Sequence, residues 1–195
     1  MNRQISFQQY RSIDLTILAV LLAISQFVIH VASSVLYPEQ LYVVSPVAAM
    51  TALVMMRWNG YAAIHALLGG VLFTALSGGT WQHAVIYGGG NLLSLLAWLM
   101  LKGFGKERVR TDAVLAVVFA LCTQVLMWLG RAGLAFVLGF EPAACIGFIT
   151  TDALSGLFTA VIIWVVRRIE GLFEDQKSYL LRIQQERQVE GREQF

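Results

Sequence analysis

The sequence predicts an all-α integral membrane protein, a six-helix bundle with its N- and C-termini in the cytoplasm. The first observation is composition: 57% of the 195 residues are hydrophobic and 13% are charged, whereas soluble domains have about 25% charged residues. The mean hydropathy is +0.67. The second observation is the length of the apolar runs. The third is the distribution of lysine and arginine.

The apolar runs set the helix count, because a spanning helix needs about 20 mainly apolar residues. Six segments fit this length approximately, and short polar turns separate them. Short connections predict that consecutive helices are antiparallel neighbours. The predicted spans are residues 14–36, 41–57, 60–77, 82–101, 112–138 and 143–167, after a cytoplasmic N-terminal segment of residues 1–13.

Local signals mark the limits of these spans. The first apolar run is too long for the core of a cleavable signal peptide and no small-residue cleavage site follows it, so we expect it to remain in the mature protein. Pro46 and Pro142 lie at the starts of the second and sixth spans, where proline is tolerated. The sequence RWNG, residues 57–60, divides the second and third spans, and Gly78-Gly79 marks the next turn.

The basic residues predict the orientation. If the N-terminus is inside, all 14 lysines and arginines except Arg131 fall in inner segments. The three outer loops carry no basic residue, and their only charges are Glu39 and Glu141. This bias is typical of cytoplasmic loops. We therefore expect a multi-pass protein of the cell (plasma) membrane.

Residues 168–195 form a distinct cytoplasmic tail. Its sequence predicts an amphipathic, charged C-terminal helix that continues out of the sixth span. An apolar stripe on that helix could contact a partner or the membrane surface. A solvated, partly frayed helix is the alternative. The stripe consists of Ile169, Leu172, Phe173, Gln176, Leu180 and Ile183.

Polar side chains recur at helical spacing inside four of the spans, which places them on one face of each helix. A membrane helix hides such a face from lipid. The residues are Gln26, His30 and Ser33 in the first span, His83, Tyr87, Asn91 and Ser94 in the fourth, Gln124, Trp128 and Arg131 in the fifth, and Asp152, Ser155 and Thr159 in the sixth.

Arg131 and Asp152 are expected to meet. Counted along their spans, both lie roughly 10–14 Å below the outer surface, at about 1.5 Å per residue. One interpretation is a structural ion pair that fixes helix register. The other is a binding site, in which Arg131 holds an anionic or carbonyl group of a solute from outside. The two interpretations are compatible.

The second interpretation predicts a substrate-binding site in the outer half of the bundle. Aromatic rings would stack on the ligand, and polar side chains would form hydrogen bonds with it. The predicted set is Arg131, Asp152, Trp128, Gln124, Asn91, Tyr87, His83 and Trp81, with Tyr42 as a further stacking surface. No cofactor is expected, and no pair of histidines has the spacing of metal ligands.

No enzymatic activity is expected. The chain lacks a G-x-S-x-G elbow, an H-E-x-x-H motif, paired mid-span aspartates and a nucleotide-binding loop. The glycine runs 69–70 and 88–90 lie within apolar spans, where glycine allows close helix approach or a helix break. The expected partners are a small molecule and the lipid bilayer, and no nucleic acid.

Together with the stretch AVLLA at residues 19–23, this architecture resembles the substrate-binding (S) component of energy-coupling factor (ECF) transporters. The resemblance implies capture of a vitamin, vitamin precursor or metal ion from outside, in the outer half of the bundle. It also implies that Ala19 and Ala23 dock on a transmembrane coupling subunit, which works with two ATPase subunits. The N-terminus is not histidine-rich, which argues against the nickel and cobalt branch.

Two other classes of protein remain open. The chain could be a structural or scaffolding membrane protein, or a sensor, that acts through its cytoplasmic tail. In both cases the Arg131–Asp152 pair would only fix helix register, and Ala19 and Ala23 would only pack against a neighbouring helix.

Overall fold

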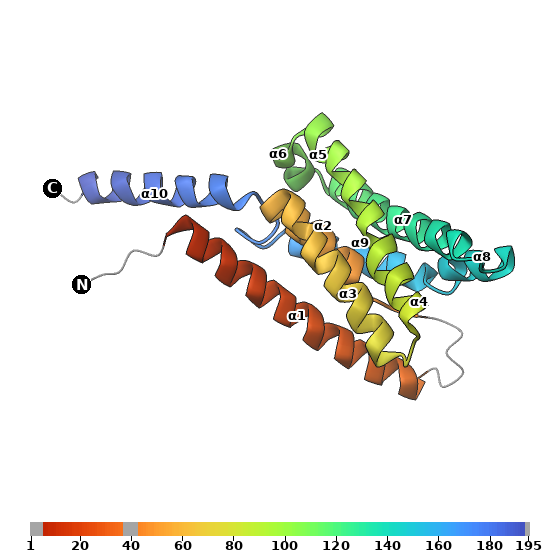
Figure 1. Ribbon diagram of the computed structural model, residues 1–195. Helices are drawn as coiled ribbons and strands as arrows, with labels where there is room; N and C mark the ends of the chain where they lie inside the picture. The colour runs from red at the N-terminus through yellow and green to blue at the C-terminus, as the bar shows by residue number, and fades with distance from the viewer. Residues whose placement is uncertain (1–5, 37–42, 194–195) are drawn as a thin grey trace.

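The computed structural model describes residues 6–36 and 43–193, and every regular element in these ranges is helical. This confirms the predicted all-α class. The beginning of α1 and the C-terminal helix α10 lie at the same end of the bundle (Figure 1). Five helical segments of the described chain are long and apolar enough to cross a membrane: Phe7–Leu36, Val47–Leu76, Trp81–Phe104, Ala113–Val137 and Pro142–Val166.

Helix α1 is a single helix, Phe7–Leu36, which starts seven residues before the predicted span. Residues 7–13 of the predicted N-terminal segment are therefore its first turns. Only one stripe of α1 is buried, formed by Leu18, Leu22 and Gln26. Most of the other large apolar side chains of α1 are exposed, as expected for a helix at the edge of a bundle in lipid.

The segment Val47–Leu76 folds back on itself. Helix α2 (Val47–Trp58) and helix α3 (Ala62–Leu76) are joined by the short turn η1 (Asn59–Tyr61). Asn59 has a φ of 54°, a left-handed conformation that asparagine tolerates better than most residues. A Cβ added to Gly69 would lie 2.6 Å from the Val47 side chain, so the two helices are antiparallel. Residues 41–42 of the second predicted span lie outside the described residues.

The fourth segment is not a uniform α-helix. A π-helical turn and a 3₁₀ turn lie within it, where the neighbouring helix comes very close. A Cβ on Gly130 would lie 2.0 Å from the Gly90 carbonyl oxygen, so two glycines are needed at this contact. The close-packing interpretation of the glycine run is confirmed here. The parts are α4 (Trp81–Ala84), η2 (Val85–Gly89), η3 (Leu92–Ala97) and α5 (Trp98–Phe104).

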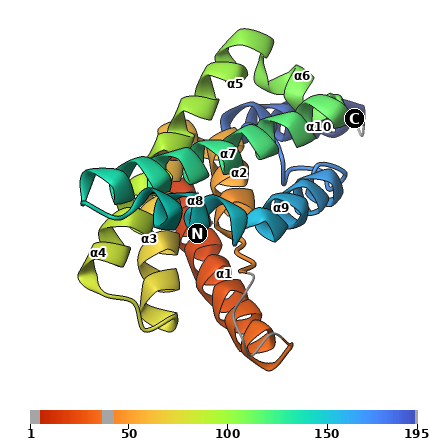
Figure 2. The ribbon, with the colours of Figure 1, turned by 90° about the vertical axis from the view of Figure 1, so that its right-hand side faces the viewer.

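After the short α6 (Lys106–Thr111), helix α7 (Ala113–Val137) runs the length of the bundle. Asp112 caps α7 by accepting hydrogen bonds from the backbone N–H groups of Val114 and Leu115. The sixth predicted span is broken into α8 (Pro142–Thr150) and α9 (Ala153–Val166), with Asp152 at the break. Both parts lie alongside α7 (Figure 2).

The prediction that the tail continues the sixth span as one helix is wrong. Helix α9 ends at Val166, the chain turns, and α10 (Gln176–Glu193) starts afterwards and projects from the bundle (Figure 1). Within this turn Gly171 has a φ of 73°, a left-handed conformation that glycine adopts without strain. Phe173 is buried in the core and holds the turn against it. Residues 194–195 of the predicted tail lie outside the described residues.

Candidate functional site

Arg131 and Asp152 meet in the interior of the bundle. The Arg131 Nη1 atom lies 2.6 Å from Asp152 Oδ2, and each residue is only 3% exposed. Arg131 is near the end of α7, and Asp152 sits where α8 and α9 are interrupted. The predicted contact is therefore confirmed, while a ligand-binding role stays a prediction.

The Asp152 carboxylate is the centre of a hydrogen-bond network. Its Oδ2 atom accepts bonds from Arg131, from Trp128 Nε1 at 3.0 Å and from Gln124 Nε2 at 3.1 Å. Its Oδ1 atom accepts a bond from the Ser155 hydroxyl. Gln124, Trp128 and Arg131 are spaced by four and three residues, so they share the predicted polar face of α7. All three donate to the same carboxylate.

The other side of Arg131 connects it to two further helical segments. Its Nε donates to Asn91 Oδ1 at 2.8 Å, and Asn91 Nδ2 donates to the Ala66 carbonyl oxygen of α3 at 3.0 Å. The guanidinium carbon also lies 4.9 Å from the centre of the Tyr87 ring, a cation–π distance. Six of the eight predicted site residues are thus joined around one ion pair.

Sequence reasoning missed Ser45, which extends this network toward α1. The Ser45 N–H donates to the Ser155 hydroxyl at 2.8 Å, and its own hydroxyl donates to Gln26 Oε1 at 3.3 Å. Close by, the Val43 N–H donates to the Thr151 carbonyl oxygen at 2.9 Å, which satisfies backbone groups at the helix break. The only available signal was a serine directly before Pro46, at a helix start.

The predicted open pocket is filled by side chains in this structure. Beside the ion pair lies a cavity of about 10 Å³, room for about one water molecule. Aromatic contacts cover it: the Tyr87 ring lies 4.6 Å from Phe73 and 5.5 Å from Phe148. The lining residues are Val43, Ser45, Val47, Gly69, Gly70, Phe73, Tyr87, Arg131 and Asp152.

Trp81 and His83 do not join the network. Trp81 is 67% exposed at the start of α4. His83 Nδ1 accepts a hydrogen bond from the Thr80 N–H at 3.3 Å, and its ring packs edge-on against Phe140. Both residues lie in α4, at the start of the fourth segment. Tyr42 lies outside the described residues.

A second ion pair, largely buried, lies at the opposite end of the bundle, and sequence reasoning missed it. Arg57, which is 5% exposed, donates two hydrogen bonds to Asp14, at 2.6 and 3.0 Å. Trp58 Nε1 donates to the same carboxylate at 2.5 Å. The signal in the sequence was slight: Asp14 is the only acidic residue among the first 36.

This second pair also holds the tail. Arg57 Nη1 donates to the carbonyl oxygens of Gly171 and Leu172, at 2.6 and 2.9 Å. Further ion pairs then link the tail to α6, namely Lys106–Asp175 at 2.5 Å and Arg110–Glu174 at 3.2 Å. The start of the tail is therefore packed against the bundle and fixed to it by hydrogen bonds and ion pairs.

Comparison of the chain with protein-family models, curated proteins and solved structures yields no match. Within residues 6–36 and 43–193, no three or more His, Cys, Asp or Glu side chains gather as a possible metal site. The features of the molecule that bear on function are therefore the Arg131–Asp152 and Arg57–Asp14 ion pairs and the helices that carry them.

Proposed function

We propose that the protein is the membrane-embedded substrate-binding subunit of an ECF-type importer and captures a small organic nutrient, such as a vitamin or precursor, from outside. The observation that carries this proposal is the Arg131–Asp152 pair, buried at a helix break. Ionisable groups inside a membrane are costly and mark substrate pathways. Irregular backbone is tolerated there only where protein buries it or where it lines a cavity.

The two charges have different roles in this proposal. Asp152 already accepts hydrogen bonds from Arg131, Trp128, Gln124 and Ser155, so it serves to orient its donors. Arg131 is the group that receives the ligand, because a guanidinium matches a carboxylate or carbonyl oxygen through several parallel N–H groups.

Access to Arg131 from outside requires the aromatic cover to move. The Tyr87 ring lies 4.9 Å from the guanidinium carbon and 5.5 Å from the Phe148 ring of α8. In the proposed binding step Tyr87 and Phe148 separate, and the Tyr87 and Trp128 rings then stack on the ligand. Asn91 and Gln124 supply hydrogen bonds to it.

The proposal includes six membrane crossings, with α2 and α3 counted separately. The hairpin turn between them supports this count. At about 1.5 Å per residue, the 12 residues of α2 span roughly 18 Å, less than the hydrocarbon thickness. Apart from Met50, all residues of α2 are buried, so protein rather than lipid surrounds this short helix.

An even number of crossings puts both termini on one side, and the basic residues assign that side to the cytoplasm. Labelling intact cells with a membrane-impermeant maleimide tests this orientation. A cysteine in place of Glu141 should react in intact cells, and one in place of Lys177 should react only after permeabilisation. Labelling at position 177 in intact cells would refute the orientation.

The proposed partners are a transmembrane coupling subunit, docked on α1, and two ATPase subunits. Ala19 and Ala23 are half-buried on α1, beside exposed apolar side chains such as Ile24 and Phe27. Native mass spectrometry of the tagged protein, gently extracted from its own membrane, tests this. A complex with these subunits would support the proposal, and bare protein would count against it.

The second candidate is a structural, scaffolding or sensory protein that acts through its tail. The projection of α10 away from the bundle favours it (Figure 1). In that case the same mass spectra should show cytoskeletal or signalling proteins, and truncation at Glu170 should abolish function while Trp128→Ala leaves it intact. A transport subunit should instead lose its function in Trp128→Ala.

A further inference from the structure

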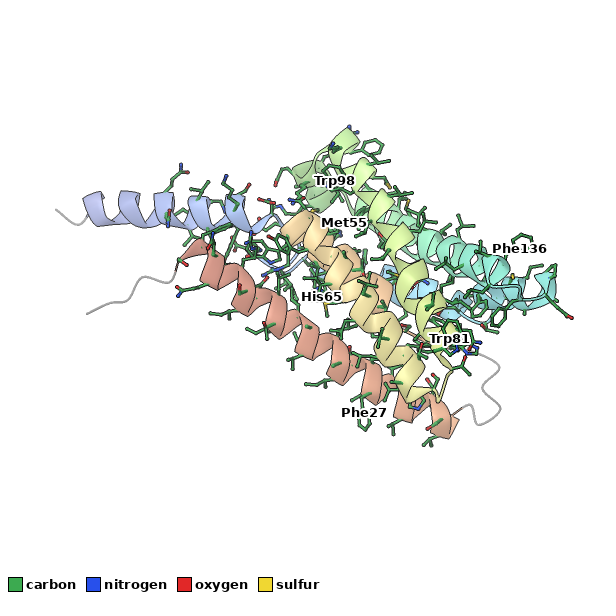
Figure 3. The ribbon with its side chains drawn as sticks, viewed as in Figure 1. Phe27, Met55, His65, Trp81, Trp98 and Phe136 are labelled. Atoms are coloured by element: carbon green, nitrogen blue, oxygen red, sulfur yellow. The ribbon has the colours of Figure 1, made fainter. Side chains whose placement is uncertain are left out.

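Two apolar hollows lie next to each other at the end of the bundle opposite the Arg131 network. The first has a volume of about 210 Å³ and is lined by Met55, Asn59, Gly60, Leu95 and Trp98. The second has a volume of about 320 Å³ and is lined by Trp58, Asn59, Gly60, Tyr61 and Ile64. Because they share Asn59 and Gly60, they are contiguous around the turn between α2 and α3. Figure 3 shows Met55 and Trp98 close to this turn.

The hollows are large enough for hydrocarbon. An apolar cavity of about 150 Å³ holds a benzene molecule. Their walls are mainly carbon, from the Met55 and Leu95 side chains and the Trp98 and Ile64 side chains. In a membrane protein such a surface is filled by lipid chains or by another apolar helix.

A cation sits above an aromatic ring at the rim of each hollow. Lys102 Nζ lies 4.0 Å from the centre of a Trp98 ring, and the Arg11 guanidinium lies 4.5 Å from the centre of the Tyr61 ring. Neither cation forms an ion pair with a carboxylate of the described residues, unlike Arg57 and Lys106 nearby. Both are therefore available to an external anion.

We infer that these hollows, with Lys102 and Arg11 at their rims, form a binding site for one anionic phospholipid. The acyl chains occupy the hollows, and the two cations hold the phosphate-bearing headgroup. The exposed Asn59 lines both hollows and offers its side-chain amide to the headgroup. Basic pockets between membrane helices on the cytoplasmic side bind anionic headgroups in this way.

The charge at the rim is what favours a lipid over a protein helix. A helix seated in the hollows would cover Lys102 and Arg11 and leave both cations without an anion unless it supplied carboxylates. An anionic lipid supplies the charge and the hydrocarbon together. The site uses no residue of the Arg131 network. Trp58, however, lines the second hollow and also donates to Asp14, so the lipid would lie against the side chains that hold the tail.

The first test is a lipid titration of the purified chain followed by native mass spectrometry. Phosphatidylglycerol is compared with phosphatidylcholine carrying identical acyl chains. The first phosphatidylglycerol molecule to bind should do so more tightly than the first phosphatidylcholine molecule, by on the order of fivefold for each cation. Arg11→Gln with Lys102→Gln should remove this preference. The matched control is Arg168→Gln, because Arg168 also covers a ring, that of Trp164 at 3.9 Å, but lines neither hollow.

The second test fills the hollows. A Cβ at Gly60 meets no atom within 4 Å, and its φ is not in the left-handed region, so Gly60→Leu adds a side chain without strain. It should abolish tight binding of both lipids, while Gly103→Leu, equally open and outside both hollows, should leave it unchanged. Equal wild-type affinity for the two lipids, or unchanged binding to Gly60→Leu, would overturn the proposal and point to a protein helix instead.

Discussion

The guanidinium of Arg131 lies 2.6 Å from the carboxylate of Asp152, and both side chains are almost completely buried. Arg131 belongs to α7, and Asp152 lies at the break between α8 and α9. Removing one member of such a pair leaves an uncompensated buried charge, whereas removing both does not. The pair therefore couples the two halves of the broken span to α7.

Substitution of one member should be strongly destabilising. Arg131→Ala and Asp152→Ala should each lower the free energy of unfolding by about 3–5 kcal/mol. The double substitution should cost less than the sum, because no unpaired charge remains. Thermal or denaturant unfolding in detergent gives the coupling energy as a double-mutant cycle. Strictly additive losses would show that the pair does not hold the helices together.

The close approach of α7 to the fourth segment should be sensitive to a single methyl group. A Cβ at Gly130 would lie 2.0 Å from the Gly90 carbonyl oxygen, so Gly130→Ala should cost about 1–3 kcal/mol. Gly133, one turn later, has no atom within 4 Å of an added Cβ. Gly133→Ala should be neutral or stabilise by up to about 1 kcal/mol. Equal effects of the two changes on the unfolding temperature would contradict the observed packing.

Arg57 should control the position of the tail. Arg57→Gln removes hydrogen bonds from a charged donor to Gly171 and Leu172, each worth about 1.5–3 kcal/mol. The loss of even one of these bonds should raise amide hydrogen exchange over residues 168–175 roughly 10- to 100-fold. Arg168→Gln, which removes only a contact with Trp164, is the control. Unchanged exchange in Arg57→Gln would mean that the tail is held by its other ion pairs alone.

The tail contact should also weaken in acid. Partial burial raises the pKa of Asp175, but the hydrogen bond and charge of Lys106, together with hydrogen bonds from Ser178, outweigh burial and leave that pKa below its ordinary value. Because the pKa is lowered, the ionised Asp175 carboxylate stabilises the docked tail at pH values above the free carboxyl pKa of about 3.9. This stabilisation is lost as the pH falls through the pKa that Asp175 has in the docked tail. A fluorophore on a cysteine at position 177 should therefore gain mobility below about pH 4.

Asp175→Asn is the matched control for this pH dependence. Asparagine retains a side-chain oxygen that can cap α10 but cannot carry a charge. The variant should hold its tail more weakly at neutral pH and show a smaller change on acidification, since only other carboxyls titrate. Identical pH profiles for the two proteins would assign the acid sensitivity to groups other than Asp175.

Much of the fold could be predicted because hydropathy and helical spacing report on it directly. The apolar runs predicted the helices, and the steps between Gln124, Trp128 and Arg131 predicted one polar face of α7, which the structure confirms. The depth of Asp152 in its span predicted its contact with Arg131. Each of these inferences depends on residues within one helix or in adjacent helices.

The remaining features depend on contacts that have no periodic signal. Asp14 and Arg57 are 43 residues apart, and charges near the ends of spanning helices are ordinarily solvated, so their pairing could not be read from the sequence. The break before α9 involves Asp152, which looks like any polar residue within an apolar run. The turn at Gly171 depends on Arg57, a residue from a distant helix.

Ligand binding at Arg131 is measured most directly as the amount of small organic molecule released from the purified protein. Wild type is compared with Arg131→Lys, which keeps the charge beside Asp152 but loses the guanidinium fork, and with Trp81→Ala, which lies outside the network. If Arg131 holds the ligand, wild type and Trp81→Ala should each release one molecule per chain, and correctly folded Arg131→Lys at least tenfold less. Equal release from all three, or none from wild type, would contradict it.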